Sequence, residues 1–210
     1  MITMKTVSTS AAPARRRIGR PLSFDRDQAL EAAMHVFWRN GYETSSIADL
    51  TAAMGITPPS LYTAFGDKKQ LFLEAVDRYA GDISALSSVF ADAATARDAA
   101  RNLLHATAVA FTGETTPRGC LLASATASGS AASKDVQEKV AIIREKVAAT
   151  LRERIDRDVS SGLLPEHTDA TALAWMVVAL IQGMSTLARD GVVRADLIAM
   201  TNAALEGWPT

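Results

Sequence analysis

The sequence predicts an all-α fold in two parts, and three observations predict it. Apolar residues recur at helical spacing from about residue 25 to residue 206, and no segment alternates in the way that predicts a strand. Capping residues and glycines divide this pattern into separate helices. The chain has 210 residues, of which 48% are hydrophobic, so it can bury one or two cores. We therefore expect a helical N-terminal domain followed by a helical bundle.

Composition excludes several other classes of protein. Cys120 is the single cysteine, which excludes an internal disulfide framework and a cysteine-rich zinc site and favours a reducing compartment. The longest strongly apolar stretch, residues 172–181, is shorter than the roughly 20 residues that span a bilayer. The first 20 residues lack the apolar centre of a signal peptide. These features predict a cytoplasmic protein without a membrane partner.

Charge is distributed unevenly, although the formal net charge of the chain is only −1. Residues 1–20 contain five basic residues, Arg17 and Arg20 among them, and no acidic residue. Residues 1–80 contain ten basic and eight acidic residues, whereas residues 81–210 contain twelve and fifteen. A basic, flexible arm over residues 1–20 predicts a polyanionic partner for the front of the chain. A solubilising tail is the alternative interpretation.

Two helices are expected to open the folded part. The first covers about residues 25–40, because Leu30, Ala33 and Phe37 share one helical face and Asn40-Gly41 can end the helix. Asp25 is the expected cap. The second runs from about residue 47 to residue 55, with Ser46 and Asp49 as a possible capping box.

The third helix accounts for two adjacent prolines. Thr57 is a suitable N-cap, and Pro58 and Pro59 follow it in the first turn, where backbone N–H groups have no intrahelical partner. The prolines therefore start this helix and prevent the second helix from continuing. Leu61 and Phe65 fall on its buried face. The remaining surface carries Ser60, Tyr62 and Thr63, and the helix ends at Gly66.

Helix, tight turn and short capped helix form the helix-turn-helix pattern, whose second helix enters the DNA major groove. Lys68 and Lys69 stand in the first turn of the next helix, where cations oppose the helix dipole. A DNA phosphate bound beside these lysines would offset this unfavourable interaction. Nearby hydroxyl groups are of the kind that positions a DNA backbone; they belong to Ser45, Ser46, Thr57 and Tyr62.

Residues 20–79 resemble the DNA-binding domain of the TetR/AcrR family of transcriptional regulators. The matching stretches are GRP at 19–21, AAMHVFWRNGYETSSIADL at 32–50, AAMGITPPSLYTAFGDKKQL at 52–71 and FLEAVDRY at 72–79. The resemblance implies a three-helix DNA-binding domain at 21–66, a connecting helix at 67–80 and a regulatory domain at 81–210. It also implies roles for individual residues: phosphate contacts from Tyr62, Lys68, Ser45, Ser46 and Thr57, and base-facing positions for Pro58, Pro59 and Thr63.

The sequence departs from the family pattern at one functional position. Family members often carry a basic residue or glycine where Pro58 and Pro59 stand. Base recognition is therefore expected to depend on apolar contacts, for example with thymine methyl groups, and on Thr63.

The C-terminal half is rich in alanine and helical in pattern. Helices are expected at about 68–80, 95–112, 119–127, 134–160, 169–190 and 195–206. Thr168 is the expected cap of the helix at 169–190, which is apolar almost all round and so should be buried on every side, in part by another subunit.

The family resemblance continues in PRGCLLASA at 117–125 and in GLLP and IQG between 162 and 183. It implies a homodimer built from the last two long helices and a pocket for a small effector, which we expect to be apolar or aromatic. The candidate pocket residues are Leu103, Phe111, Leu121, Trp175, Met176 and Met184. The function expected from these features is a ligand-responsive repressor that binds a palindromic double-stranded DNA operator.

Three alternatives stay open at this stage. His105 and Cys120 suggest a metal or redox sensor, although a soft-metal site needs more ligands than these two and no metal site is predicted. A DNA-binding regulator without a small-molecule effector is the second alternative. An enzyme is the third, but the sequence contains no recognisable catalytic motif, so we expect neither catalytic residues nor a cofactor.

Overall fold

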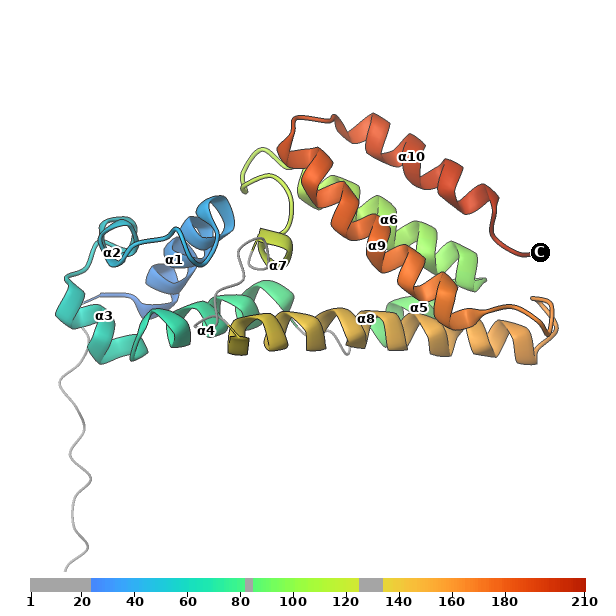
Figure 1. Cartoon of the computed structure of the whole chain (residues 1–210), viewed down its shortest axis with the longest axis horizontal. Helices are drawn as coiled ribbons and strands as arrows, with labels where there is room; N and C mark the ends of the chain where they lie inside the picture. The colour runs from blue at the N-terminus through green and yellow to red at the C-terminus, as the bar shows by residue number, and fades with distance from the viewer. Residues whose placement is uncertain (1–23, 82–84, 125–133) are drawn as a thin grey trace, which may run out of the picture.

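The computed structural model describes residues 24–81, 85–124 and 134–210. Over these residues it contains helices and no strand, arranged as a small N-terminal group beside a longer bundle (Figure 1). The helices are α1 (Arg26–Asn40), α2 (Ile47–Met54), α3 (Pro58–Phe65), α4 (Lys68–Ala80), α5 (Ala85–Asp92), α6 (Ala96–Phe111), α7 (Leu121–Ser124), α8 (Lys134–Ser160), α9 (Ala170–Arg189) and α10 (Arg194–Glu206). The all-α prediction is therefore confirmed.

The N-terminal helices begin where their capping residues stand. The Asp25 side chain accepts hydrogen bonds from the backbone N–H groups of residues 27 and 28, and Ser46 and Asp49 form the predicted capping box. Thr57 and Asp67 cap α3 and α4 in the same way. The caps predicted at Asp25, Ser46 and Thr57 are confirmed, because each is a local interaction within a few residues of chain.

An aromatic core holds α1, α3 and α4 together. The Phe37 and Phe72 rings meet edge to face, with their centroids 5.0 Å apart. Leu50, Leu61 and Phe65 are buried in the same core, so the buried face predicted for the third helix is confirmed. The opposite face of α3 is left outside this core.

The C-terminal bundle is built around α8 and α9, which pack against each other, while α6 contacts α8, α9 and α10. Figure 1 shows α8 running from beside α4 to the opposite end of the molecule. Its 27 residues correspond to about 40 Å of helix.

Two details of the bundle differ from the sequence prediction. α5 (ALSSVFAD) was not predicted. The cap of α9 is Asp169, whose side chain accepts a hydrogen bond from the backbone N–H of Ala172 at 2.8 Å. The predicted cap, Thr168, is wrong by one position.

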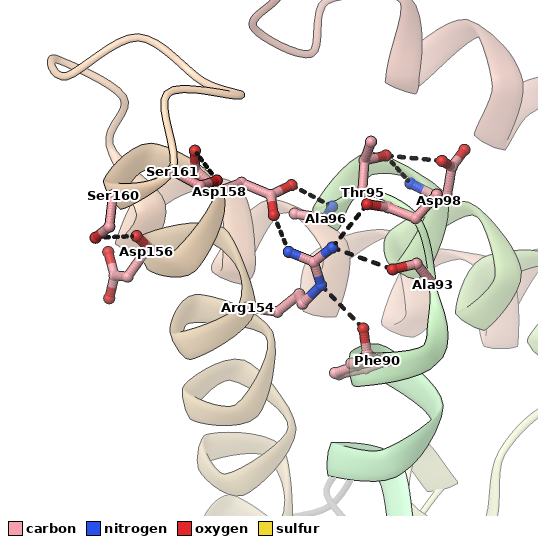
Figure 2. Close-up of polar contacts among 11 residues, drawn as sticks. Phe90, Ala93, Thr95, Ala96, Asp98, Arg154, Asp156, Asp158, Ser160 and Ser161 are labelled. Atoms are coloured by element: carbon pink, nitrogen blue, oxygen red, sulfur yellow. Dashed lines mark hydrogen bonds and ion pairs between the residues drawn. The ribbon is translucent and has the colours of Figure 1, made fainter.

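A buried ion pair fastens α8 to the α5–α6 corner (Figure 2). Arg154 pairs with Asp158 one turn later, and its guanidinium also donates hydrogen bonds to the carbonyls of Phe90, Ala93 and Ala94. Asp158 in turn accepts the backbone N–H at the start of α6, at 2.6 Å. The pair therefore satisfies carbonyl groups in the corner and ties the two helices to α8.

Among the described helices, α9 is long and apolar enough to cross a membrane by length and composition alone. It packs against α6, α8 and α10, as a core helix of a bundle does. The prediction that α9 is buried on every side is only partly confirmed within one chain, because Trp175 is 42% exposed.

Candidate nucleic-acid interface

The turn between α2 and α3 determines which face of α3 is presented. α2 ends at Gly55, which has a left-handed backbone (φ 65°) and donates to carbonyls at the end of α2. The side-chain oxygen of Thr57 then accepts the N–H of Ser60, and the two prolines form the first turn of α3. The first turn of α3 is therefore exposed, and α3 lies at the end of the molecule away from the C-terminal bundle (Figure 1).

The predicted base-facing residues share one exposed surface. Pro58, Pro59 and Thr63 are exposed, and Tyr62 is 50% exposed. Ser60 is half-buried next to them. This surface, which we call the α3 face, carries no charged side chain, so its possible base contacts are apolar or involve neutral hydroxyl groups.

Hydroxyl groups on the α3 face are already engaged locally. Thr63 Oγ1 donates to the carbonyl of Pro59 at 2.8 Å, and the hydroxyls of Thr57 and Ser60 lie 3.0 Å apart. A threonine hydroxyl that donates to its own helix keeps its acceptor capacity and leaves its methyl group outward. Thr63 thus offers an acceptor and a methyl group.

Ser45 and Ser46 occupy different environments. Ser45 is buried, and its hydroxyl donates to the carbonyl of Gly41 at 2.6 Å. Ser46 is exposed at the start of α2, where its hydroxyl and backbone N–H donate to Asp49. These two hydrogen bonds hold the pKa of Asp49 below its usual value. Of these two serines, only Ser46 therefore has an exposed side chain.

Lys68 is held at the start of α4. Its Nζ donates to the carbonyl of Glu43 at 3.2 Å and lies 4.7 Å from the centre of the Tyr42 ring. Burial lowers the pKa of Lys68, and the nearby Glu43 partly opposes that shift. The neighbouring Lys69 instead forms an ion pair of 2.7 Å with Asp135 of α8.

The part of the N-terminal domain that the structure describes is acidic. Residues 24–80 contain five basic and eight acidic residues, which gives a formal charge of −3. The basic candidates Arg17 and Arg20 lie outside the described residues. Any electrostatic attraction to DNA from this part of the chain must therefore depend strongly on the arm and on Lys68 and Lys69.

The six candidate pocket residues lie in different environments. Five belong to the core or pack against it: Phe111, Leu121 and Met184 are buried, and Leu103 and Met176 are half-buried. Trp175 is instead on the outer side of α9. Two pockets in the described part of the chain, of about 360 and 170 Å³, are lined by other residues.

His105 and Cys120 have different neighbours. The ring of His105 hydrogen-bonds with Asn202 of α10 at 2.9 Å, whereas Cys120 is buried and accepts a hydrogen bond from the Tyr79 hydroxyl at 3.4 Å. Burial, followed by the neighbouring Cys120, raises the pKa of Tyr79. Among the described residues no three His, Cys, Asp or Glu side chains are grouped as metal ligands.

Sequence reasoning missed the contacts that join the two domains. The Trp38 indole donates to the carbonyl of Gly119 at 3.0 Å, and Arg189 donates to the carbonyl of Trp38 at 2.6 Å. Asp77 of α4 pairs with Lys139 of α8 at 2.6 Å. The partners are far apart in the sequence, so no local pattern indicates them.

The fold and this surface define a class of protein: a helix-turn-helix domain with an exposed third helix, joined to a separate helical bundle. Comparison with known proteins identifies the family. Residues 29–75 match "Bacterial regulatory proteins, tetR family", and residues 96–190 match "Tetracyclin repressor-like, C-terminal domain". The chain belongs to the TetR family of transcriptional regulators.

Individual relatives agree with this assignment. The HTH-type transcriptional repressor ComR of Escherichia coli (strain K12) is 35% identical over 208 residues, covering 98% of each chain. The repressor BdcR of the same organism is 44% identical over 63 residues, or 30% of this chain and 32% of its own. The regulator CifR, solved as a cysteine mutant with a 26-base-pair operator, is 41% identical with a TM-score of 0.84 over 90% of this chain and 100% of that one.

Proposed function

We propose that this regulator is a repressor that binds a palindromic double-stranded DNA operator as a homodimer and is released by a small molecule. The observation that carries DNA binding is the exposed α3 face, placed between the capped start of α2 and Lys68. In this arrangement Pro58, Pro59 and Thr63 contact base edges, while Ser46, Thr57 and Tyr62 contact phosphates. The named repressors and the operator complex of CifR support the same function.

The homodimer proposal is supported by one exposed side of α9. Ala172, Trp175, Ala179 and Gly183 follow one another at helical spacing, and all four are exposed in the single chain. Small residues let a second helix approach closely, and an exposed tryptophan among them adds apolar area. Association through this side would place two α3 faces on successive turns of a duplex, about 34–36 Å apart or a multiple of that distance.

The effector proposal concerns how the two domains move together. α4 is linked to α8 by Lys69–Asp135 and Asp77–Lys139, and α1 is linked to α9 by Arg189. A ligand that binds better to one arrangement of α4, α8 and α9 shifts the spacing of the two α3 faces. We propose an apolar or aromatic molecule entering between the core residues Leu121 and Met184, where the helices must separate to admit it. Coupling of about 1–3 kcal/mol is typical of such regulation.

Selection of DNA from a random double-stranded library tests the main proposal. The purified chain should enrich a two-fold symmetric sequence whose half-sites are separated by one helical turn or a multiple of it. Enrichment of no sequence, or of an asymmetric single site, would contradict the proposed dimeric repressor.

The dimer has its own test. Ala179→Arg should convert a dimer to a monomer in light scattering at micromolar concentration, because it places an unpaired charge in the interface. Ala141→Arg is the matched control, since Ala141 is an exposed alanine on α8. Leu180 and Ile181 are poorer test positions because both are half-buried and pack against the core of their own chain.

The effector is tested by adding apolar and aromatic compounds to the complex of protein and selected operator. Release at the same concentration from wild type, Trp175→Ala and Met176→Ala would exclude these two residues from the ligand site. Loss of dimerisation in Trp175→Ala would instead assign this residue to the subunit interface. If no compound changes operator affinity, regulation without a small-molecule effector replaces the proposal.

A further inference from the structure

A pocket lies at the end of the bundle opposite the α3 face. It is enclosed by the start of α6, the end of α8 with the loop after it, and residues 208–210, and it has a volume of about 360 Å³. We call it the distal pocket. Its lining residues are Thr95, Arg97, Asp98, Arg101, Asp158, Leu163, Leu164, Trp208, Pro209 and Thr210. Figure 1 places the end of α8 and the last described residues at the same end of the molecule, far from α3.

The two carboxylates of the distal pocket are already neutralised by partners. Asp158 pairs with Arg154 and accepts the N–H of Ala96, and Asp98 accepts a hydrogen bond from Thr95 Oγ1 at 2.8 Å (Figure 2). Asp98 also pairs with Arg101. The hydrogen bond from Thr95 and, after it, the pair with Arg101 lower the pKa of Asp98 against the opposing effect of burial. Neither carboxylate therefore attracts a cation strongly.

Two arginines of the distal pocket have more N–H groups than the hydrogen bonds they make. Arg97 uses Nε and Nη2 to hold the carbonyl of Leu205, at 3.1 and 2.9 Å, and Arg101 uses Nη1 for Asp98. Each guanidinium has five N–H groups, so both retain donors. Arg154 pairs with Asp158 and Arg101 pairs with Asp98, whereas Arg97 forms no ion pair among the described residues.

Trp208 adds an unpaired donor to this group. Its side chain is buried, with 3% exposure, and its indole N–H has no hydrogen-bond partner among the described residues. A buried donor without an acceptor costs free energy that an acceptor from a ligand can recover.

The other walls are apolar. Leu163 is 56% exposed although it is a large aliphatic residue, and Leu164 and Pro209 extend the same wall. The volume is at the lower end of the roughly 300–1,000 Å³ that small-molecule sites occupy. The pocket thus suits a small molecule with an apolar body and a single anionic group.

We propose that the distal pocket binds a small carboxylic acid with a short alkyl chain or a single ring, held by Arg97 and Arg101. The carboxylate accepts hydrogen bonds from the guanidinium groups and from the Trp208 indole, and the apolar body covers Leu163. This site is separate from the core region proposed above for the effector, since the two share no residue.

The test uses octanoate as the probe and the three tryptophan indole N–H resonances as reporters. The full-length protein, labelled with ¹⁵N, is titrated with octanoate and, in parallel, with the neutral octanamide. Trp208→Phe assigns the Trp208 resonance, and Trp38 and Trp175 serve as internal references. We expect octanoate to shift the Trp208 resonance saturably, and octanamide to bind at least about tenfold more weakly, because a charged acceptor strengthens each hydrogen bond.

Variants locate the site. Arg101→Met and Leu163→Glu should each weaken octanoate binding about tenfold or more, by removing a cation and by placing a carboxylate beside the ligand. Arg152→Met changes an exposed arginine of α8 that does not line the pocket, so it should bind octanoate as wild type does. Unchanged Trp38 and Trp175 resonances in the absence of octanoate confirm that a variant is folded.

Three results would overturn the proposal: no shift of the Trp208 resonance with octanoate, equal affinity for octanoate and octanamide, or wild-type affinity in both Arg101→Met and Leu163→Glu. A shift confined to the Trp38 or Trp175 resonance would place octanoate elsewhere and would also reject the distal pocket. Because the readout is binding itself, the result is independent of whether the chain represses transcription.

Discussion

Replacing Arg154 with methionine should destabilise the fold severely, and the structure gives the size of the effect. Arg154 is 7% exposed and Asp158 2% exposed. The substitution leaves the Asp158 carboxylate without its cation, with a hydrogen bond from the N–H of Ala96, and removes the donor from the carbonyls of Phe90, Ala93 and Ala94. Loss of one partner of a buried pair typically costs about 3–5 kcal/mol. For a chain of this size that corresponds to a fall in Tm of about 6–20 °C.

The assay is urea unfolding followed by circular dichroism, at one protein concentration because the stability of an oligomer depends on concentration. Lys134→Met is the matched control: Lys134 pairs with Glu138 at 3.6 Å on the same helix, but both side chains are more than half exposed. Such a pair contributes at most about 1 kcal/mol. The double variant Arg154→Met/Asp158→Leu should recover much of the lost stability, because it also removes the stranded carboxylate.

Equal stability losses in Arg154→Met and Lys134→Met would refute this reasoning. A double variant as unstable as Arg154→Met alone would show that the lost stability comes from the carbonyl groups of the α5–α6 corner and not from an uncompensated charge.

Three further predictions concern DNA. Lys68→Ala should weaken binding to all sequences and flatten the slope of log K against log salt concentration by roughly one to two units per dimer, measured by fluorescence anisotropy, because a phosphate contact positions without specifying; an unchanged slope would remove Lys68 from the phosphate contacts. Since burial lowers the pKa of Lys68, operator affinity should begin to fall at a lower alkaline pH in wild type than in Lys68→Arg, and coincident pH profiles would contradict this. Deleting residues 1–18 should reduce affinity most at low salt and leave the Tm unchanged, because the remaining N-terminal domain is acidic; equal affinity would restore the interpretation of these residues as a solubilising tail.

The sequence predicted those parts of the fold that depend on neighbouring residues. Thr57 and the two prolines determine the start of α3 within four residues of chain, so the helix-turn-helix pattern could be read directly. Asp169 was missed because it stands next to another residue that can cap a helix, Thr168. Local patterns therefore identify helices well, but they do not distinguish between two adjacent residues that can both cap a helix.

The functional surface was predicted less completely than the fold. The α3 face follows from helical spacing, and the structure leaves Pro58, Pro59 and Tyr62 exposed as that spacing requires. The spacing could not indicate that Ser45 points its hydroxyl inward to Gly41, or that Trp175 is on the outside of α9. These placements depend on how whole helices pack against one another. The same is true of the distal pocket, which joins residues from about 95 to 210.

The most direct test of the account is photo-crosslinking from the α3 face. A photoreactive phenylalanine derivative replaces Tyr62, or replaces Ile142 of α8 in a control protein; the two side chains are 50% and 53% exposed. If α3 reads DNA, irradiation with the selected operator should crosslink the protein labelled at position 62, and excess unlabelled operator should abolish the crosslink. Position 142 should give none. Equal crosslinking from both positions, or crosslinking from position 142 alone, would contradict DNA recognition by α3.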